Sequence, residues 1–580
     1  MIKKITAAFL SVLLIFSAAA CAPTLTESPL QTGSISENTP APSLPTPSPE
    51  PDFPDYPEEK ISLTNLSEYV IVYPSYYNEY RMNEVKLLQS TIKNVTGAEL
   101  EIISDGEQAH EHEIIFASSK RQNGVEESIS MFESGLDYVV GALNGNIILG
   151  GNNFYADMRA VYDFINNYLG YNDIDDIYSE PKSKISGVNL NIYEEPLLTL
   201  MGSNFSIQPY TEQYAIRDMH EAHFNLTLID IDQYSKDQLR DFIKWCARYE
   251  IFIIMRGINY TELYTDCPVI WGHSITDEPA ISMFESYSQA CYDYLEKYAQ
   301  YGWQPFVNFT ADEYVWQILE EFPDLFDCVP VVSLDRYFGQ NLIENIHIGG
   351  NLLHMYEQAM ELAAKRGNNL WTYIESYDIA HGNKNTSKLF RWSSYISLCF
   401  GAKGILYFQY CDIPYPDQPE FSDGTLVNPD YSKTEAWYDA KECNKELRKI
   451  AEILEQYNSA GVYVHNTAGI EYLNTYIENP YTEFDSIVTD IRKPRNTIPY
   501  LFGFYDNKDN SNSHAVVMLS LESLDDVQYG KNEPEYAQIK LAGDNIKFYH
   551  EGVLQNIEPD ADGYYSIDVS NGSCWLVTLD

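Results

Sequence analysis

The chain has 580 residues, of which 44% are hydrophobic and 14% aromatic, and its formal net charge is −48. A chain of this length is too long to fold around a single hydrophobic core, so we expect about two to four domains. The strong negative charge argues against nucleic acids and anionic lipid surfaces as partners, because like charges repel.

The first residues have the pattern of an export signal. Lys3 and Lys4 precede an apolar run over residues 7–20, which is too short to span a membrane comfortably. Small residues end this run directly before Cys21, an arrangement that resembles the bacterial lipoprotein signal, whose cysteine accepts a diacylglyceryl group. The leucine usual three residues before that cysteine is Ala18 here. An ordinary cleaved signal with a chance cysteine is the alternative.

A tether is expected after the signal. Residues 22–58 are rich in Pro, Ser, Thr and Glu, a composition that cannot bury a core and favours an extended, disordered chain. With residues 1–21 as signal peptide and lipidated cysteine, the pattern predicts an extracytoplasmic protein. It would be anchored to the outer face of the cytoplasmic membrane through the lipid on Cys21 alone.

The other cysteines predict no metal centre. Eight remain after Cys21, and they show neither a Cys-x-x-Cys spacing nor a partnering histidine pattern. We expect most of them to be small core residues, and we expect neither a metal nor a cofactor. The pattern leaves disulfides open.

Residues 59–194 carry the alternation of a small α/β domain. Four short apolar runs predict strands at residues 69–73, 100–103, 112–117 and 146–151, and helices are expected at 84–95 and 160–169. This order resembles the small α/β domain that precedes the barrel in hexosaminidases and α-glucuronidases. The likeness covers the pattern and no catalytic residue, so a generic βα unit is the alternative.

Residues 195–460 predict a (β/α)8 TIM barrel, which makes the protein α/β in class. Eight strand candidates follow one another with room for helices between them, for example at 236–249 and 283–298. The strands are expected at residues 197–203, 224–229, 251–256, 269–276, 305–309, 329–334, 370–376 and 404–410.

Polar side chains follow these apolar strands. The C-terminal ends of barrel strands converge on one mouth, where substrates bind. The polar residues expected there include Asp277 with Glu278, Asn308, Asp335, Glu375 and Gln409. Asp277 and Glu278 could instead only cap the next helix, with Pro279 in its first turn.

Two carboxyls stand out by position. Glu278 follows strand four and Glu375 ends strand seven, and these strands face each other across an eight-stranded barrel. Cleavage of a glycosidic bond uses one carboxyl as acid and a second on the opposite side of the anomeric carbon. The pattern resembles the clan of barrel glycosidases with Asn-Glu-Pro after strand four and a strand-seven Glu. That resemblance implies a retaining glycoside hydrolase with Glu278 as acid/base and Glu375 as nucleophile, although Asp277 replaces the clan's Asn.

The adjacent Asp277 and Glu278 also resemble the hexosaminidase family. There the Glu is the acid and the Asp holds the substrate's 2-acetamido group, whose carbonyl attacks the anomeric carbon, so Glu375 would not be the nucleophile. The family's His-x-Gly-Gly-Asp-Glu is only partly matched by residues 273–278. A carbohydrate-binding lipoprotein without catalysis is a third possibility. Both enzymatic hypotheses make Glu278 the proton donor.

Further residues near the strands suit a carbohydrate partner, although for each of the aromatic ones core packing is at least as good an explanation. Aromatic rings can stack on sugars or raise a carboxyl pKa by desolvation, amides and carboxyls can bind hydroxyls, and an arginine can bind a carboxylate or, preferably, pair with a site acid. The candidates are Trp271, Trp371, Tyr337, Tyr373, Tyr407, Asn308, Asp335, Gln409 and Arg256. Residues 401–408 resemble the eighth-strand segment of exported glycosidases related to the β-galactosidase group.

Residues 461–580 change to short alternating strands. These are expected at 500–505, 515–521, 537–540, 547–549, 564–569 and 575–579, with turn residues between them. The pattern predicts a C-terminal β-sandwich, which resembles the terminal β-domain common after glycosidase barrels. It could brace the barrel, the preferred role, or bind carbohydrate. The sequence predicts no oligomeric state.

Overall fold

The structure is a computed structural model of the chain. It describes residues 52–204, 213–310, 313–337, 352–376, 387–411, 424–465, 477–492, 499–521, 534–570 and 572–580. The predicted signal, Cys21 and nearly all of the tether lie outside these ranges. The chain divides into residues 1–52 and 53–580, and only the second unit is considered below. Across the described ranges, no helix has both the length and the apolar composition of a membrane span.

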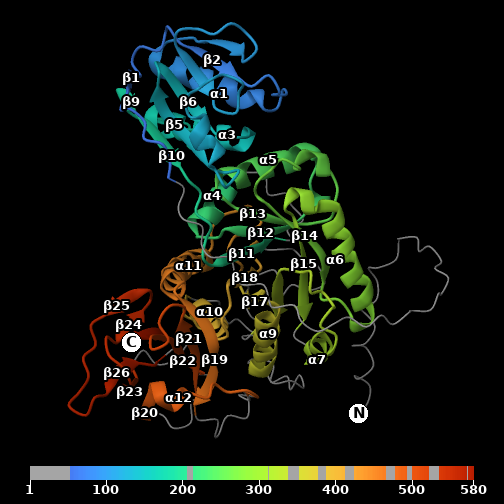
Figure 1. Cartoon of the computed structure of the whole chain (residues 1–580), viewed down its shortest axis with the longest axis vertical. Coiled ribbons are helices and arrows are strands. Elements are labelled where there is room, and N and C mark those ends of the chain that lie inside the picture. The colour runs from blue at the N-terminus through green and yellow to red at the C-terminus, as the bar shows by residue number, and fades with distance from the viewer. Residues whose placement is uncertain are drawn as a thin grey trace, which may run out of the picture. The chain divides into compact units, whose positions relative to one another are not determined.

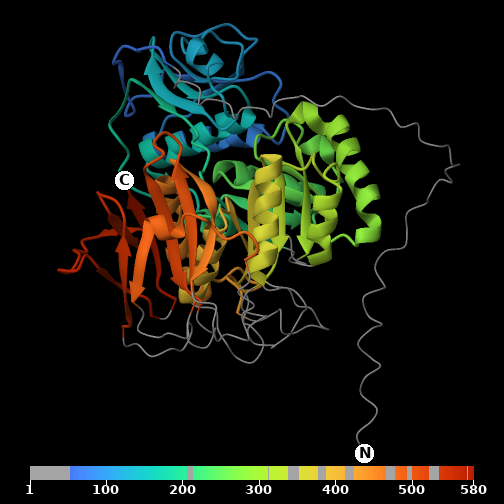
Figure 2. The same cartoon turned by 60° about the horizontal axis from the view of Figure 1, so that its bottom comes forward.

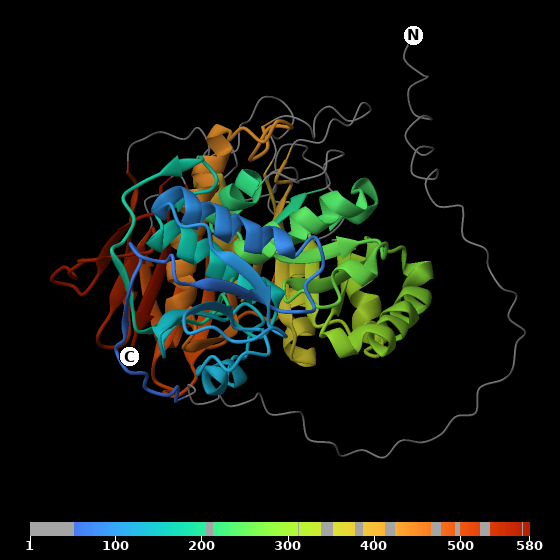
Figure 3. The same cartoon turned by 90° about the horizontal axis from the view of Figure 1, so that it is seen from above.

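A six-stranded sheet forms the first α/β layer, in blue and cyan in Figures 1 and 3. Its strand order is β10 (Val188–Asn191), β5 (Tyr138–Leu143), β6 (Asn146–Gly150), β4 (Glu113–Phe116), β2 (Val70–Tyr73) and β3 (Glu101–Ser104). Its helices are α1 (Met82–Thr96) and α3 (Phe154–Asp163), which continues as a π-helical turn over Phe164–Tyr168. The four predicted strands are confirmed.

Strand β5, which pairs with β6 in a hairpin, was not among the predicted strands. Asn144 and Gly145 form its turn with φ of 53° and 78°, the left-handed conformations that a two-residue hairpin turn requires. Asn-Gly between apolar runs is a strong hairpin signal, so this strand was predictable.

Eight parallel strands close into a barrel in chain order, as predicted. They are β11 (Thr199–Asn204), β12 (Leu226–Asp230), β13 (Phe252–Arg256), β14 (Ile270–Asp277), β15 (Gln304–Thr310), β16 (Val331–Asp335), β17 (Asn369–Glu375) and β18 (Gly404–Phe408). The helices lie outside the strands (Figures 1 and 2), and they are α4 (Gln213–Glu221), α5 (Lys236–Arg248), α6 (Phe284–Tyr298), α7 (Glu313–Glu321), α9 (Leu352–Arg366), α10 (Ser387–Cys399) and α11 (Glu435–Leu454).

Alternate strand residues fill the barrel interior. Phe306, Val331, Trp371 and Tyr373 belong to one buried cluster, while their chain neighbours pack against the helices. Trp371 lies so close to β18 that a Cβ at Gly404 would meet its ring at 2.5 Å. The lower barrel is therefore a packed core, and substrate can approach only at an end.

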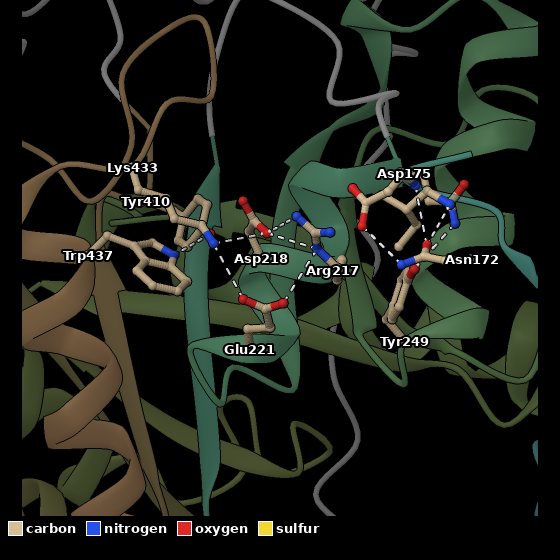
Figure 4. Close-up of polar contacts among 11 residues, drawn as sticks. Asn172, Asp175, Arg217, Asp218, Glu221, Tyr249, Tyr410, Lys433 and Trp437 are labelled. Carbon is tan, nitrogen blue, oxygen red and sulfur yellow. Dashed lines mark hydrogen bonds and ion pairs between the residues drawn. The ribbon is translucent and has the colours of Figure 1, made fainter. Parts of the chain in front are cut away.

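The seam between the first and last strands is closed by parallel pairing of β11 with β18 and by a polar cluster outside it. Figure 4 shows Lys433 between two acids of α4, with its Nζ 3.1 Å from Asp218 Oδ1 and 3.4 Å from Glu221 Oε2. The same ammonium lies 4.0 Å from the ring centre of Trp437, whose Nε1–H donates to Tyr410 Oη over 3.3 Å. These contacts fasten α4 to Lys433, which precedes α11, and Trp437 of α11 packs against the same lysine.

Two antiparallel sheets form the predicted C-terminal sandwich. One has the order β19 (Tyr457–His465), β21 (Tyr500–Asn507), β22 (His514–Ser520), β27 (Cys574–Leu579), β24 (Lys547–His550) and β25 (Val553–Gln555). The other is β20 (Val488–Arg492), β23 (Tyr536–Leu541) and β26 (Tyr565–Asp568). All six predicted strands are confirmed, and β19, β20 and β25 are additional.

The larger sandwich sheet packs on barrel helix α10. Trp392 of α10 is buried and donates its Nε1–H to the carbonyl of Ser520 over 2.9 Å. Gly503 approaches the backbone of Cys399 so closely that any Cβ would collide with it. Since Leu398 also accepts a hydrogen bond from the buried Tyr505 hydroxyl, the sandwich contacts the barrel as a brace.

Candidate active site

The side-chain alternation decides which strand-end residues face the barrel axis. Trp371 and Tyr373 belong to the interior cluster, so Glu375, two residues farther along β17, continues the same face. By the same rule Asn308 follows Phe306 on β15, and Asp335 follows Val331 on β16 at a four-residue spacing. The predicted mouth therefore receives Asn308, Asp335 and Glu375.

Glu278 has an unusual backbone conformation. Its φ is +45°, in the left-handed region that a residue with a side chain avoids, and Pro279 further restricts the residue before it. Its N–H donates to the carbonyl of Asn308 over 2.9 Å, which holds this conformation. Among the described residues it is the sole non-glycine residue of positive φ directly after a barrel strand. Strain of about 1–3 kcal/mol at such a position is typical of functional sites.

The side chain of Asn308 donates hydrogen bonds to two carboxyls at the mouth, one on each neighbouring strand. Its Nδ2 donates to Asp277 Oδ1 over 3.0 Å and to Asp335 Oδ2 over 2.7 Å. The hydroxyl of Ser333 donates to Asn308 Oδ1 over 2.8 Å, which fixes the orientation of the amide. Asn308 is buried and Asp277 is exposed, so the amide holds Asp277 in place and leaves it accessible to a substrate.

Burial, together with the charge of neighbouring carboxylates, raises the pKa values of two carboxyls here. Burial, followed by the charge of Asp277, raises the pKa of Glu278, and a hydrogen bond from Thr310 opposes that rise. Glu278 is more than a third exposed, so water limits the shift. Burial and the charge of Glu278 raise the pKa of Asp335 to about 7, against hydrogen bonds from Tyr337 and Asn308. Asp335 is therefore partly protonated near neutral pH, and the raised pKa of Glu278 favours its protonated form, which is the form that an acid catalyst needs.

Two tyrosines surround these carboxyls. Tyr373 is almost fully buried, and its pKa is raised by burial and then by Asp335 and Asp277, which places its hydroxyl within their field. Tyr337 is half-buried, with its ring centre 5.8 Å from that of Phe408. These rings limit the access of water to the carboxyls from the barrel side.

The end of β17 is tied to the end of β18. The N–H of Ser376 donates to the carbonyl of Phe408 over 2.8 Å, and its hydroxyl donates to the carbonyl of Gln409 over 2.8 Å. Glu375 is 1% exposed and Gln409 is fully buried. Both predicted residues are therefore buried where β17 and β18 end, whereas Asp277 and Glu278 are exposed.

Three predicted aromatic residues do not lie at the mouth. Trp271 and Trp371 are near the starts of β14 and β17, with ring centres 5.4 Å apart, and both line a small cavity at the opposite end of the barrel. Tyr407 faces the helices, where its hydroxyl donates to Asn444 Oδ1 over 2.7 Å and its ring meets Phe224. The prediction that these side chains contact substrate is corrected, because all three serve packing.

Arg256 ends β13 and lines the same cavity as Asp277. It is exposed and, with Asp277, Ser274 and Tyr287, lines a cavity of about 450 Å³. Among the residues that the structure describes it forms no ion pair, so the preferred prediction of a pairing with a site acid is corrected. Its guanidinium is available to a ligand at this edge of the mouth.

A larger cavity lies elsewhere in the described part of the chain. It measures about 740 Å³ and is lined by Tyr193, His220, His223 and Arg448 among others, near the starts of β11 and β12. None of the strand-end carboxyls lines it, so it is not the candidate active site. Within the described ranges, no group of three or more His, Cys, Asp or Glu side chains could hold a metal ion.

Neither a family model nor a curated protein matches this chain. Among solved structures, a family 39 glycoside hydrolase from Bacteroides cellulosilyticus WH2 has 9% identity and a TM-score of 0.41, over 69% of this chain and 86% of that one. A family 30 subfamily 8 xylanase from Clostridium acetobutylicum has 10% identity and a TM-score of 0.31, over 67% and 97%. A beta-galactosidase from Marinomonas ef1 has 10% identity and a TM-score of 0.32, over 44% of this chain and 60% of that one.

These three solved structures are glycoside hydrolases. At these identities and TM-scores the likeness assigns no family. A function must therefore come from the side chains at the mouth.

Three hydroxyl residues of the mouth escaped the sequence analysis. Ser333 orients Asn308, Thr310 donates to Glu278, and Ser203 lies against the Tyr373 hydroxyl. Ser333 and Thr310 each lie two residues from a predicted site residue on the same strand. The period-two rule of strands could therefore have found them.

Proposed function

We propose that this protein is an extracytoplasmic glycoside hydrolase that acts on oligosaccharides or polysaccharides. The observation that carries the proposal is Glu278, a strained carboxyl after strand four whose pKa is raised and whose backbone is held by Asn308. A carboxylic acid that keeps its proton near neutral pH can protonate the oxygen of a leaving group.

The mechanism we propose is retaining. Glu278 gives its proton to the glycosidic oxygen while the Glu375 carboxylate attacks the anomeric carbon, so the glycosidic bond breaks and a glycosyl ester forms. Glu278, now ionised, takes a proton from water, and the hydroxide displaces Glu375. Support for Glu375 comes from its inward-facing position on strand seven, opposite strand four. A carboxyl separation of about 5–5.5 Å suits this route, and about 6.5–9.5 Å suits inversion.

A specific contact favours one alternative mechanism. Asn308 holds the exposed carboxylate of Asp277 in a fixed orientation. A carboxylate so placed beside the acid could position a 2-acetamido group, whose carbonyl oxygen would then attack the anomeric carbon. In that case Glu375 supports the site and forms no ester, and the substrates are N-acetylhexosaminides.

The experiment is a panel of chromogenic glycosides, with and without a 2-acetamido group, together with soluble oligosaccharides. Release of the chromophore from any member supports hydrolysis, and the preference for the acetamido sugars selects between the two mechanisms. If no member of the panel is hydrolysed but oligosaccharides bind measurably, the protein is a carbohydrate-binding lipoprotein and not an enzyme of this class.

The location is proposed from the first 58 residues. Cys21 would carry the lipid, and residues 22–58 would let the catalytic unit reach away from the membrane. Labelling of cells with a lipid precursor should mark the wild type, and the Cys21→Ser variant should lose the label. A labelled Cys21→Ser protein, or an unlabelled wild type, would remove the anchor from the proposal.

A further inference from the structure

Helix α6 and the turn before β16 are held together by two side-chain contacts. The N–H of Phe326 donates to the buried hydroxyl of Ser288 over 3.0 Å. The hydroxyl of Tyr292 donates to the carboxylate of Asp327. These contacts involve residues directly next to two thiols, since Cys291 precedes Tyr292 and Cys328 follows Asp327.

The contacts of Ser288 with Phe326 and of Tyr292 with Asp327 bring the two thiols into each other's neighbourhood. The interaction between the side chains of Cys291 and Cys328 is the largest influence on the pKa of either thiol. Cys291 is fully buried, whereas Cys328 is partly exposed. An external oxidant can therefore reach one member of the pair, and the second already lies beside the first.

We propose that Cys291 and Cys328 form a disulfide once the chain has left the cytoplasm. Thiols persist in the cytoplasm because it is reducing, while extracytoplasmic compartments permit disulfides. The compartment comes from the proposed export of this protein, but the reach of the two thiols is independent of export and of hydrolysis.

The oxidant is a disulfide, either of an extracytoplasmic thiol oxidoreductase or of a small thiol. The Cys328 thiolate attacks one sulfur of that disulfide and expels a thiolate, which gives a mixed disulfide. The Cys291 sulfur loses its proton to solvent or to the expelled thiolate and then displaces the second thiol. Two cysteines are oxidised and one external disulfide is reduced to two thiols. The hydrogen bond from Cys291 lowers the pKa of Cys328, which suits it to the first attack.

The cross-link would brace the candidate active site. Helix α6 follows strand four, which ends at Asp277 and Glu278, and the turn with Cys328 leads into β16, which ends at Asp335. The chain between the two cysteines contains β15 with Asn308. A disulfide would thus enclose the strand that bridges Asp277 and Asp335, and restrict its separation from both neighbours.

A second cysteine pair provides a matched comparison. Cys246 on α5 and Cys267 before β14 have the same relation to the barrel, two βα steps earlier. Both are buried, and Cys267 interacts with the Tyr155 hydroxyl. We therefore expect this pair to stay reduced, since neither sulfur is open to an oxidant.

The test uses the full-length protein, first reduced and then incubated with oxidised glutathione. After unfolding and alkylation, peptide mapping by mass spectrometry should give one linked peptide pair that contains Cys291 and Cys328. The Cys328→Ser variant should give none, and the Cys246→Ala variant should keep it. Both thiols recovered as alkylated peptides, or Cys328 recovered only with glutathione attached, would overturn the proposal.

The same mapping on protein alkylated inside intact cells tests the native state. A Cys291–Cys328 peptide pair there is the expected result. If the disulfide forms in vitro but both thiols are found reduced in cells, the bond does not form in the protein's own compartment. That result would overturn the proposal of a native disulfide. Activity of the Cys328→Ser variant on the glycoside panel is measured separately, so failure of the disulfide and failure of the hydrolase are distinguishable.

Discussion

The N–H of Glu278 donates to the carbonyl of Asn308 over 2.9 Å, across the ends of strands four and five. Asn308 also donates from its side chain to Asp277 and Asp335. One buried residue thus holds the backbone of the proposed acid and the side chains of two neighbouring carboxyls. The strain at Glu278 is sustained by this arrangement.

Asn308→Ala should lower kcat by about 10- to 100-fold, because hydrogen bonds to charged groups contribute about 1.5–3 kcal/mol. KM should change little, since Asn308 acts through Asp277 and Glu278. Loss of the amide should also raise the pKa of Asp335, because the amide lowers it now. Steady-state kinetics against pH measure both effects. Ser333→Ala, which removes only the bond to Asn308 Oδ1, is the control and should lose less activity.

The raised pKa of Asp335 leads us to expect that the free energy of unfolding depends on pH. Its pKa rises from 3.8 to about 7 on folding, so the folded protein binds more protons than the unfolded chain between these values. The stabilisation is full below about pH 4 and is lost as the pH rises through 7. Asp335→Asn has no proton to lose, so from pH 4 to 8 it should gain on the order of 4 kcal/mol over the wild type. Denaturant unfolding at both pH values measures this, and a pH-independent difference would contradict it.

Two substitutions separate the mechanisms. In the retaining route Glu375→Gln should abolish turnover and Asp277→Asn should reduce it moderately. In the acetamido-assisted route the order is reversed, because Asp277 then positions the attacking group. Initial rates on paired substrates with and without the 2-acetamido group decide the question. If both variants keep nearly the initial rates of the wild type, both routes are excluded.

Alanine substitutions of Trp371 and Tyr337 should have different effects on stability and on KM. Trp371→Ala should destabilise the fold by about 3–5 kcal/mol with KM unchanged in the folded fraction, because Trp371 fills the closed end of the barrel. Tyr337→Ala should raise KM with little loss of stability, because this half-buried ring lies at the mouth. Unfolding curves together with KM values test the pair. A raised KM in Trp371→Ala would contradict this assignment, because it would show that Trp371 contacts the substrate.

The barrel was predictable from the sequence because each strand is an apolar run that ends in polar residues. Residues 251–256 became β13 (Phe252–Arg256), and 404–410 became β18 (Gly404–Phe408). The position of Glu278 and Glu375 after strands four and seven followed from counting. Counting could also have placed Trp271 and Trp371 near the strand starts, where they belong to the closed end.

The direction of individual side chains was harder to predict. The pairing of β14 with β15 shifts register between Ser274 and Thr276, which changes the alternation just before Asp277. Tyr407 has the same residue type as Tyr373 but the opposite parity on its strand, so it faces Asn444 and the helices. The strained φ of Glu278 depends on a hydrogen bond to a neighbouring strand, which no local pattern contains.

The most direct test of Glu278 as the proton donor compares leaving groups. Glu278→Gln should lose about 10²- to 10⁴-fold in kcat on alkyl or 4-nitrophenyl glycosides, whose leaving groups need a proton. It should lose much less on 2,4-dinitrophenyl glycosides, whose leaving group departs without one. Glu285→Gln, an exposed carboxyl on α6, is the matched control and should behave as the wild type. Equal losses on both substrate classes, or no loss on either, would contradict the assignment.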